Sequence, residues 1–266
     1  METNKSIKIL AVGNSFSVDA YEYLFGLLEF AGYCPTIGNL YIGGCDLETH
    51  LANAKSEQEC YTYYKNTDGV WQRENNRSLK FGILDEEWDI ISFQQASAKS
   101  GFPESITESI DGLVSFADEH KRNKNAEYFW LLTWAYQADS TREAFADYDR
   151  NQKKMYAAIV SAVKSEILTR PAFKKIIPAG TAIQNARTFF GDVLTRDGFH
   201  LDLTIGRFIA AFAIYGAITG DTDIPESIVP FEISNASFAA VREAVKDALK
   251  NPYEVTEPLN NPAILR

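Results

Sequence analysis

The sequence predicts an α/β protein, a three-layer α/β/α sandwich around a five-stranded parallel sheet. Short apolar runs alternate along the chain with segments of helix length. The runs are nearly continuous in hydrophobicity and are separated by helical patterns rather than by hairpin turns. Parallel strands that are buried on both faces have this pattern. The five expected strands are Ile7–Val12, Thr36–Tyr41, Asp89–Gln94, Tyr128–Thr133 and Lys175–Ala179.

The expected helices follow from apolar residues at helical spacing. The first covers Val18–Ala31 and is expected to end at Gly32, because glycine is common just after the last helical turn. Three further segments show the same period and predict helices over about Thr141–Leu168, Leu203–Ile218 and Ala236–Leu249. These helices would cover the two faces of the sheet.

One segment departs from this alternation. Cys60–Asn66 has the two-residue period of a strand, Asp68-Gly69 is a hairpin turn signal, and Val70–Arg73 returns. We therefore expect a small antiparallel hairpin, at about residues 60–74, inserted after the helix that follows the second strand. The tail, residues 252–266, contains several prolines and is expected to form an extended surface strap.

Composition limits the classes of function. The chain has 266 residues, 45% of them hydrophobic, which predicts a single domain over residues 1–266. Its net charge is −10 and it has no long Lys/Arg cluster, so no nucleic-acid partner is expected. It also lacks an apolar run long enough for a membrane span. No signal peptide is seen in the polar start, which leaves the compartment open between cytoplasm and a mature exported form.

Cysteines and histidines give no sign of a metal site. Cys34, Cys45 and Cys60 are odd in number and have no C-x-x-C spacing, which argues against a disulfide framework and a zinc site. We expect no metal and no cofactor. Cys45 is expected to be a small buried apolar residue. His50 is expected at the surface or in support of a site, and His120 at a solvated helix end.

Two short motifs carry the candidate chemistry. Ser15 lies in Gly13-Asn14-Ser15-Phe16-Ser17 after the first strand, and Asp197 precedes His200 by three residues in Asp197-Gly198-Phe199-His200. A serine nucleophile needs an imidazole to take its proton, and the imidazole needs a third group to orient it. The pattern predicts Ser15 as nucleophile, His200 as base and Asp197 as its partner. The alternative is that Ser15 only caps a helix, although Ser17 could do so instead.

The loops after the parallel strands should meet at one edge of the sheet. Attack by Ser15 on an ester would create an oxyanion, which needs preorganised donors. The candidates are the backbone N–H groups of Ser15 and Gly44 and a side-chain amide of Gln95 or Gln94. Alternatively, Gly43-Gly44 forms an ordinary turn and the glutamines only end a strand.

These motifs resemble those of the SGNH (GDSL-type) hydrolases, and the resemblance extends along most of the chain. The family has a five-stranded parallel sheet and includes esterases, lipases, thioesterases and carbohydrate deacetylases. The resemblance implies Ser15 as nucleophile, Gly44 as an oxyanion donor, and Asp197 and His200 as the base pair. The first block reads Gly-Asn-Ser here instead of Gly-Asp-Ser. The third block has Gln94-Gln95 where the family has an Asn donor, and Gln95 is the preferred equivalent.

We therefore expect a metal-independent serine esterase that removes O-acetyl groups from a carbohydrate, and its expected partner is a small-molecule or glycan ester substrate. The expected substrate contacts are Trp71, Tyr63, Gln94 and Trp134. The aromatic hairpin would overhang the Ser15 edge and stack against a sugar, unless its rings only pack the hairpin onto the body. The alternatives are a thioesterase or acyltransferase with the same triad, and a non-catalytic flavodoxin-like module that binds phosphate at a helix start. The sequence leaves the oligomeric state open.

Overall fold

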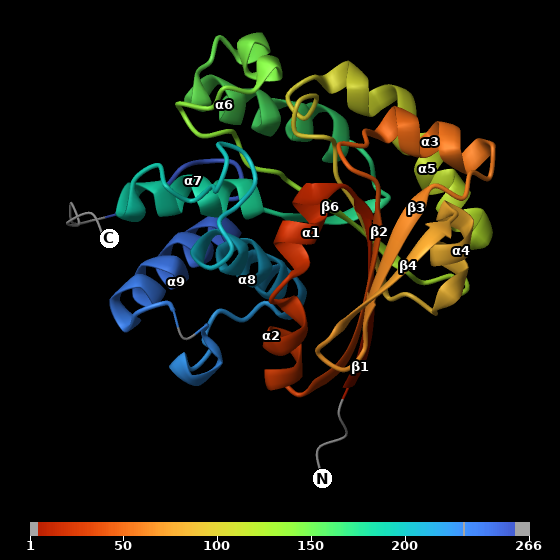
Figure 1. Cartoon of the computed structure of the whole chain (residues 1–266), viewed down its shortest axis with the longest axis horizontal. Helices are drawn as coiled ribbons and strands as arrows, with labels where there is room; N and C mark the ends of the chain where they lie inside the picture. The colour runs from red at the N-terminus through yellow and green to blue at the C-terminus, as the bar shows by residue number, and fades with distance from the viewer. Residues whose placement is uncertain (1–4, 231, 259–266) are drawn as a thin grey trace.

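A computed structural model of the chain describes residues 5–230 and 232–258. A mixed sheet of seven strands lies between two layers of helices (Figure 1). The strand order across the sheet is β4-β3-β2-β1-β5-β6-β7. The strands are β1 (Lys5–Gly13), β2 (Tyr33–Tyr41), β3 (Tyr61–Asn66), β4 (Trp71–Arg77), β5 (Ile90–Phe93), β6 (Glu127–Leu131) and β7 (Phe173–Ile177).

The five expected strands form and run parallel to one another as β2-β1-β5-β6-β7. Numbered within this set alone, their order is 2-1-3-4-5, which is the flavodoxin-like arrangement. The expected hairpin also forms, but the prediction of a five-stranded sheet is wrong for the sheet as a whole. Strand β3 pairs antiparallel with β2 and β4 pairs with β3, so the hairpin extends the sheet to seven mixed strands. This pairing satisfies the edge of β2, which would otherwise have unpaired backbone groups.

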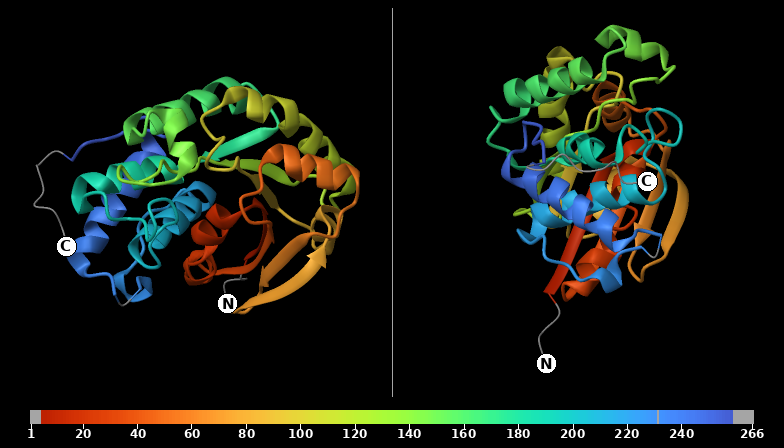
Figure 2. Two further views of the ribbon diagram at one scale, coloured as in Figure 1. Left: turned by 45° about the horizontal axis from the view of Figure 1, so that its top comes forward. Right: turned by 90° about the vertical axis from the view of Figure 1, so that its left-hand side faces the viewer.

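The helices divide between the two faces of the sheet, as the two views of Figure 2 show. Helices α1, α2, α7, α8 and α9 pack together on one face, and α3, α4, α5 and α6 lie on the other. Their bounds are α1 (Ser15–Tyr21), α2 (Leu24–Phe30), α3 (Leu47–Lys55), α4 (Leu79–Asp85), α5 (Pro103–His120), α6 (Gln152–Ala162), α7 (Ala179–Phe190), α8 (Ile205–Thr219) and α9 (Asn235–Lys250).

Two expected helices are interrupted. The segment 18–31 is divided between α1 and α2 at Glu22 and Tyr23, and the Tyr23 hydroxyl donates to the Leu203 carbonyl at 2.9 Å. The segment 141–168 starts with a 3₁₀ helix, Glu143–Tyr148, and continues as α6 only after Asp149 and Arg150, both at positive φ. The other two helices match their predictions as α8 and α9.

His50 is buried rather than at the surface. It lies on the inner side of α3, where its Nδ1 is 2.8 Å from the Tyr61 hydroxyl and its ring stacks on that of Tyr61. Burial lowers the pKa of His50 to about 4, partly opposed by Asp46. Cys45 is buried as expected, and burial, helped by Asp46, raises the pKa of its thiol to about 12.

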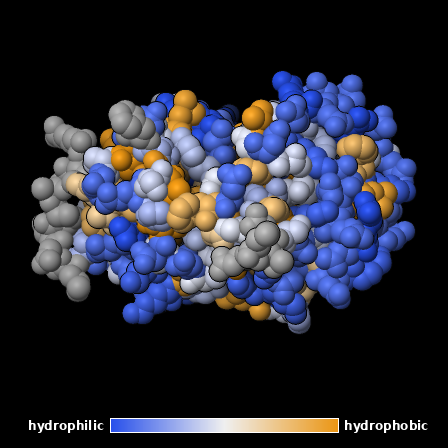
Figure 3. All heavy atoms as spheres, turned by 90° about the horizontal axis from the view of Figure 1, so that it is seen from below, coloured by the Kyte–Doolittle hydropathy of each residue, from blue (hydrophilic) through white to orange (hydrophobic). Residues whose placement is uncertain are grey.

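The end of the molecule opposite the carboxyl ends of β1 and β2 is mainly hydrophilic (Figure 3). Its hydrophobic residues gather on the side where Figure 1 places α8 and α9. Within residues 5–230 and 232–258, no helix is long and apolar enough to cross a membrane.

The tail is held at Pro252, whose carbonyl accepts from Thr181, and at Thr256, whose N–H donates to Asn185. The rest of the expected strap, residues 259–266, lies outside the described residues.

Candidate active site

The two motifs meet at the carboxyl edge of the sheet. Ser15 is the first residue of α1, directly after β1, while Asp197 and His200 lie in the loop before α8. Strand β1 lies between β2 and β5, where the chain order of the parallel strands reverses. Ligand sites in open α/β sheets form at this point, because the loops after the two central strands diverge to opposite faces.

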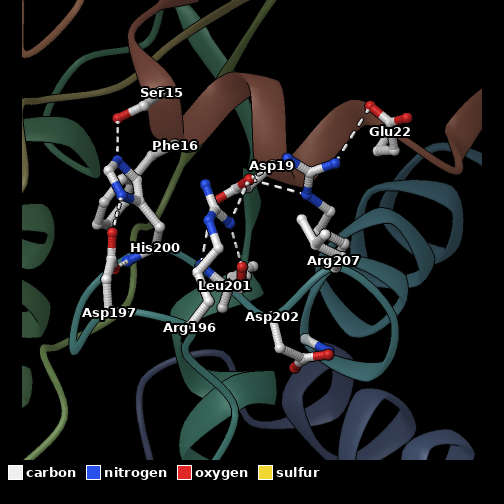
Figure 4. A network of polar contacts seen from close by, with 12 residues as sticks. Ser15, Phe16, Asp19, Glu22, Arg196, Asp197, His200, Leu201, Asp202 and Arg207 are labelled. Carbon is white, nitrogen blue, oxygen red and sulfur yellow. Dashed lines mark hydrogen bonds and ion pairs between the residues drawn. The ribbon is translucent and has the colours of Figure 1, made fainter.

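Ser15, His200 and Asp197 form a continuous hydrogen-bonded chain (Figure 4). Ser15 Oγ lies 2.8 Å from His200 Nε2, and His200 Nδ1 lies 2.6 Å from Asp197 Oδ2. The other carboxylate oxygen of Asp197 accepts the His200 backbone N–H at 2.8 Å. Partial burial opposes ionisation of Asp197, but the hydrogen bonds from His200 outweigh it, so the pKa of this carboxyl is lowered. A carboxylate in this place favours the Nδ1–H tautomer, which leaves Nε2 free to accept the serine proton.

Ser15 is not the cap of its helix. Asn14 is the N-cap, and its Oδ1 accepts the backbone N–H of Phe16 at 3.0 Å. The hydroxyl of Ser17, the other candidate cap, lies 2.8 Å from the Asn14 carbonyl oxygen and 2.9 Å from Asn39 Oδ1 and donates to one of these two acceptors. Capping by Asn14 therefore leaves the Ser15 hydroxyl available to His200.

The asparagine of Gly-Asn-Ser joins three loops. Its Nδ2 donates to the Cys45 carbonyl at 3.0 Å, and its Oδ1 accepts from Gln94 Nε2 at 3.0 Å. An aspartate could accept from Gln94 but would place a charge against the Cys45 carbonyl, since a carboxylate has no N–H to donate. The neighbouring position needs a glycine because Ser17 and Gln94 lie close to it. A Cβ at Gly13 would lie 2.8 Å from Ser17 Oγ and 3.0 Å from Gln94.

Two backbone N–H groups are available beside Ser15. Gly44 has φ +66°, a conformation that favours glycine, and its N–H makes no hydrogen bond within the described part of the chain. Ser15 is the first helical residue, so its own N–H has no acceptor inside the helix. Both residues line one cavity of about 310 Å³, together with His200. This arrangement suits an oxyanion formed at a carbonyl carbon attacked by Ser15.

Neither predicted glutamine donor lines this cavity. Gln95 Nε2 donates to the carbonyl and the hydroxyl of Ser105 at 2.9 and 3.0 Å, while its Oε1 accepts from the backbone N–H groups of Leu47 and Ala96. The prediction of Gln95 as an oxyanion donor is therefore wrong, because loop contacts use its amide. Gln94, expected to contact substrate, is buried and donates to Asn14 instead.

The hairpin aromatics do not reach the site either. Thr62 of β3 pairs with Tyr41, where β2 ends beside the cavity, but Asn66 pairs with Ile37 on β2 and with Trp71 on β4. Trp71 is thus four strand positions, about 13 Å, from the carboxyl end of β2. The turn of the hairpin, at Gly69, lies beside Phe25 of α2, toward the end of the sheet where the chain begins (Figure 1). Tyr63 is buried and its hydroxyl donates to Asp85 at 2.8 Å, so both substrate contacts were predicted wrongly.

Trp134 supports the site from beneath instead of contacting substrate. It is fully buried, and its ring stacks on Phe16 with centroids 4.2 Å apart and planes 4° apart. Its Nε1 donates to the Phe199 carbonyl at 2.7 Å, in the loop between Asp197 and His200. Trp134 therefore fixes that loop against the start of α1.

Other residues of the cavity escaped the sequence analysis. Tyr41 ends β2 and Ser97 lies in the loop after β5, which is a signal that could have identified them, whereas Arg142 lies in an irregular segment without any such signal. Phe199 is part of the second motif and its ring lies 3.9 Å from that of His200. The cavity is lined by Asn14, Ser15, Tyr41, Gly43, Gly44, Ala96, Ser97, Ala98, Arg142, Phe199 and His200.

A buried carboxylate joins α1 to the loop of the second motif (Figure 4). Asp19, one turn after Ser15, is 1% exposed. It accepts the Leu201 N–H at 3.0 Å, pairs with Arg196 at 3.1 Å, and pairs with Arg207 of α8 at 2.8 Å. Arg196 and Leu201 enclose the segment that carries Asp197 and His200, so Asp19 fixes the position of this segment relative to Ser15.

The described residues contain no group of three or more His, Cys, Asp or Glu side chains arranged to hold a metal ion. The polar groups of the site instead pair with one another or face the cavity. The arrangement brings together a serine hydroxyl, an imidazole, a carboxylate and two backbone donors.

Comparison with known proteins places the chain in a family. No curated protein matches it. A candidate SGNH hydrolase from Slackia heliotrinireducens shares 17% identity with a TM-score of 0.52, covering 80% of this chain and all of that one. A catalytic mutant of Axe2, an acetylxylan esterase from Geobacillus stearothermophilus, shares 12% identity with a TM-score of 0.50, covering 87% of this chain and all of that one. At such identities these two show a shared fold alone.

Two findings are specific to one family. The crystal structure of a DUF4886 family protein from Bacteroides uniformis shares 43% identity with a TM-score of 0.91, covering 95% of this chain and 98% of that one. The model of the family described as domain of unknown function (DUF4886) matches residues 8–248. The chain therefore belongs to the DUF4886 family and has an SGNH hydrolase-like α/β fold.

Proposed function

We propose that this protein is a serine esterase that hydrolyses carboxylic esters through Ser15, His200 and Asp197. The observation that supports this most strongly is the hydrogen-bonded chain from Ser15 Oγ through the His200 ring to the Asp197 carboxylate, at 2.8 and 2.6 Å. A capped helix start or a phosphate-binding turn would not require an imidazole and a carboxylate in this order. A nucleophile, its base and the group that orients the base do.

The reaction follows from the geometry. His200 Nε2 takes the proton of Ser15 Oγ as that oxygen bonds to the ester carbonyl carbon. The negative charge that develops on the carbonyl oxygen is stabilised by the N–H groups of Gly44 and Ser15. The carbon–oxygen bond to the alcohol then breaks, and the alcohol leaves with the proton from His200. A water molecule releases the acyl group from Ser15 by the same steps, with His200 again as base.

The proposed substrates are esters with a short acyl group, with O-acetyl groups on carbohydrates as the preferred class. The cavity at Ser15, about 310 Å³, has room for an acetyl group together with part of the alcohol. An acetylxylan esterase shares the fold, which supports the carbohydrate part by analogy. The hairpin aromatics no longer support it, because Trp71 and Tyr63 lie away from the cavity.

The test is covalent labelling combined with turnover. We expect a fluorophosphonate to label Ser15, and the wild type to hydrolyse an aryl acetate. Ser15→Ala should lose labelling and roughly 10⁴-fold or more of the rate while it stays folded. Ser115→Ala, which removes an exposed hydroxyl on α5, is the matched control and should keep both. A folded wild type that is labelled at a different serine would refute the proposal. A panel of acetylated sugars, thioesters and acyl acceptors then separates hydrolase, thioesterase and acyltransferase.

A further inference from the structure

Arg142 is the one lining residue with a permanent charge in the cavity of Ser15, as far as the described residues go. It precedes the 3₁₀ helix Glu143–Tyr148 and is exposed. Its guanidinium carbon lies 4.2 Å from the centre of the Phe199 ring. Stacking of this kind holds the flat face of a guanidinium and leaves the N–H groups at its edge free to donate.

No acidic side chain neutralises this charge. The cavity lining contains no carboxylate, and Arg142 forms no ion pair within 4.0 Å in the part of the chain that the structure describes. Arg142 also lines a second hollow together with Glu143 and Asp147, and it pairs with neither of these carboxylates. Lys99, another cation near this edge, is paired with Asp46. In a protein of net charge −10, an unpaired guanidinium beside the nucleophile suits an anionic group on the substrate.

The position of Arg142 indicates which part of the substrate carries that group. Arg142 stacks on Phe199, and the Phe199 ring lies 3.9 Å from the His200 ring. His200 protonates the departing alcohol in the proposed reaction, so Arg142 lies on the alcohol side of the cavity. The oxyanion donors belong to Ser15 and Gly44, which Arg142 does not contact through a hydrogen bond.

We propose that Arg142 selects esters whose alcohol part carries a carboxylate, such as the acetylated form of an acidic sugar. Arg142 would be a specificity-determining residue, with its planar donors paired to both oxygens of the substrate carboxylate. This inference rests on the proposed esterase function and narrows its substrate class to esters whose alcohol part is anionic.

The test compares three aryl acetates, one neutral and two anionic. Phenyl acetate is neutral, while meta- and para-acetoxybenzoate add a carboxylate to the alcohol part. We expect Arg142→Gln to lower kcat/KM for the better acetoxybenzoate, relative to phenyl acetate, by about tenfold or more. Lys153→Gln removes an exposed cation that does not line the cavity, and it should leave this ratio unchanged. An unchanged ratio in Arg142→Gln, or an equal fall in Lys153→Gln, would overturn the proposal.

A binding measurement separates failure of this inference from failure of the esterase. The amides acetanilide and para-acetamidobenzoate resemble the esters and resist hydrolysis. By NMR titration, para-acetamidobenzoate should bind the wild type about tenfold more tightly than Arg142→Gln, while acetanilide should bind both equally. If none of the three aryl acetates is hydrolysed, the esterase proposal fails. The affinities of the two amides then decide by themselves whether Arg142 binds a carboxylate. Equal affinity of para-acetamidobenzoate for both proteins overturns the role of Arg142.

Discussion

Asp19→Asn should destabilise the protein and slow catalysis together, although the Asp19 side chain does not line the cavity of Ser15. The substitution keeps the shape of the side chain and removes its charge. Arg207 then retains only Glu22, at 3.7 Å, and Arg196 loses its acidic partner. An asparagine side chain has one acceptor oxygen, so if that oxygen keeps the Leu201 N–H, the NH₂ group faces the N–H groups of Arg207 and a hydrogen bond is lost together with the charge.

The magnitude follows from burial. Removing one partner of a buried ion pair costs about 3–5 kcal/mol. The side chain of Asp19 is 1% exposed, but those of Arg207 and Arg196 are 17% and 34% exposed, so water compensates part of the lost interaction. We therefore expect a loss of about 3 kcal/mol in the free energy of unfolding. For a chain of this length, that lowers Tm by about 6–12 °C.

The assay is thermal and denaturant unfolding, with kcat for an aryl acetate measured at a temperature where the variant stays folded. Loosening the segment with Asp197 and His200 should lower kcat by roughly tenfold or more, because small misplacements of catalytic groups are costly. Asp111→Asn is the matched control, since it breaks an ion pair with Arg170 in which the carboxylate is 70% exposed. Its cost should be under about 1 kcal/mol. The reasoning is refuted if Asp19→Asn and Asp111→Asn change Tm equally.

Three further predictions concern buried groups near the site. Asn14→Asp, which restores the Gly-Asp-Ser pattern, should lower both stability and kcat. The buried Cys45 carbonyl loses its donor, at a cost of about 1–3 kcal/mol in the free energy of unfolding. Unchanged unfolding and turnover would contradict this prediction. The pKa of His50 is about 4 in the folded protein and 6.5 in the unfolded chain. The unfolded chain therefore binds a proton at higher pH, and the free energy of unfolding falls by up to about 3 kcal/mol as the pH drops from 6.5 to 4. Denaturant titrations should show a weaker fall in His50→Phe, and equal slopes would show that another group titrates. Thiol titration of the folded protein should modify exposed Cys34 and Cys60 and reach buried Cys45 only on unfolding, so fast reaction of all three would be inconsistent with this burial.

The sequence alone determined the parallel core of the sheet and the groups of the candidate triad. Strands buried on both faces must be apolar along their length, so the five parallel strands could be recognised in the sequence as five apolar runs. Ser15 could be found because a serine after a strand is a local pattern, and His200 with Asp197 because their spacing is local too. The resemblance to SGNH hydrolases connected the two motifs. Ser15 and His200, which form a hydrogen bond, are 185 positions apart in the sequence.

Only the tertiary structure decided where the remaining polar and aromatic side chains point. Gln95 donates to Ser105 and Gln94 to Asn14, so contacts outside their own strand remove both from the cavity. Trp71 lies far from Ser15 because the pairing of β3 with β2 directs the hairpin tip the other way. The role of Asp19 depends on Arg196, Leu201 and Arg207, which folding brings to it. The role of Arg142 depends on the absence of a carboxylate beside it in the described part of the chain. A side chain's function here depends on distant partners, and no local pattern of residues encodes them.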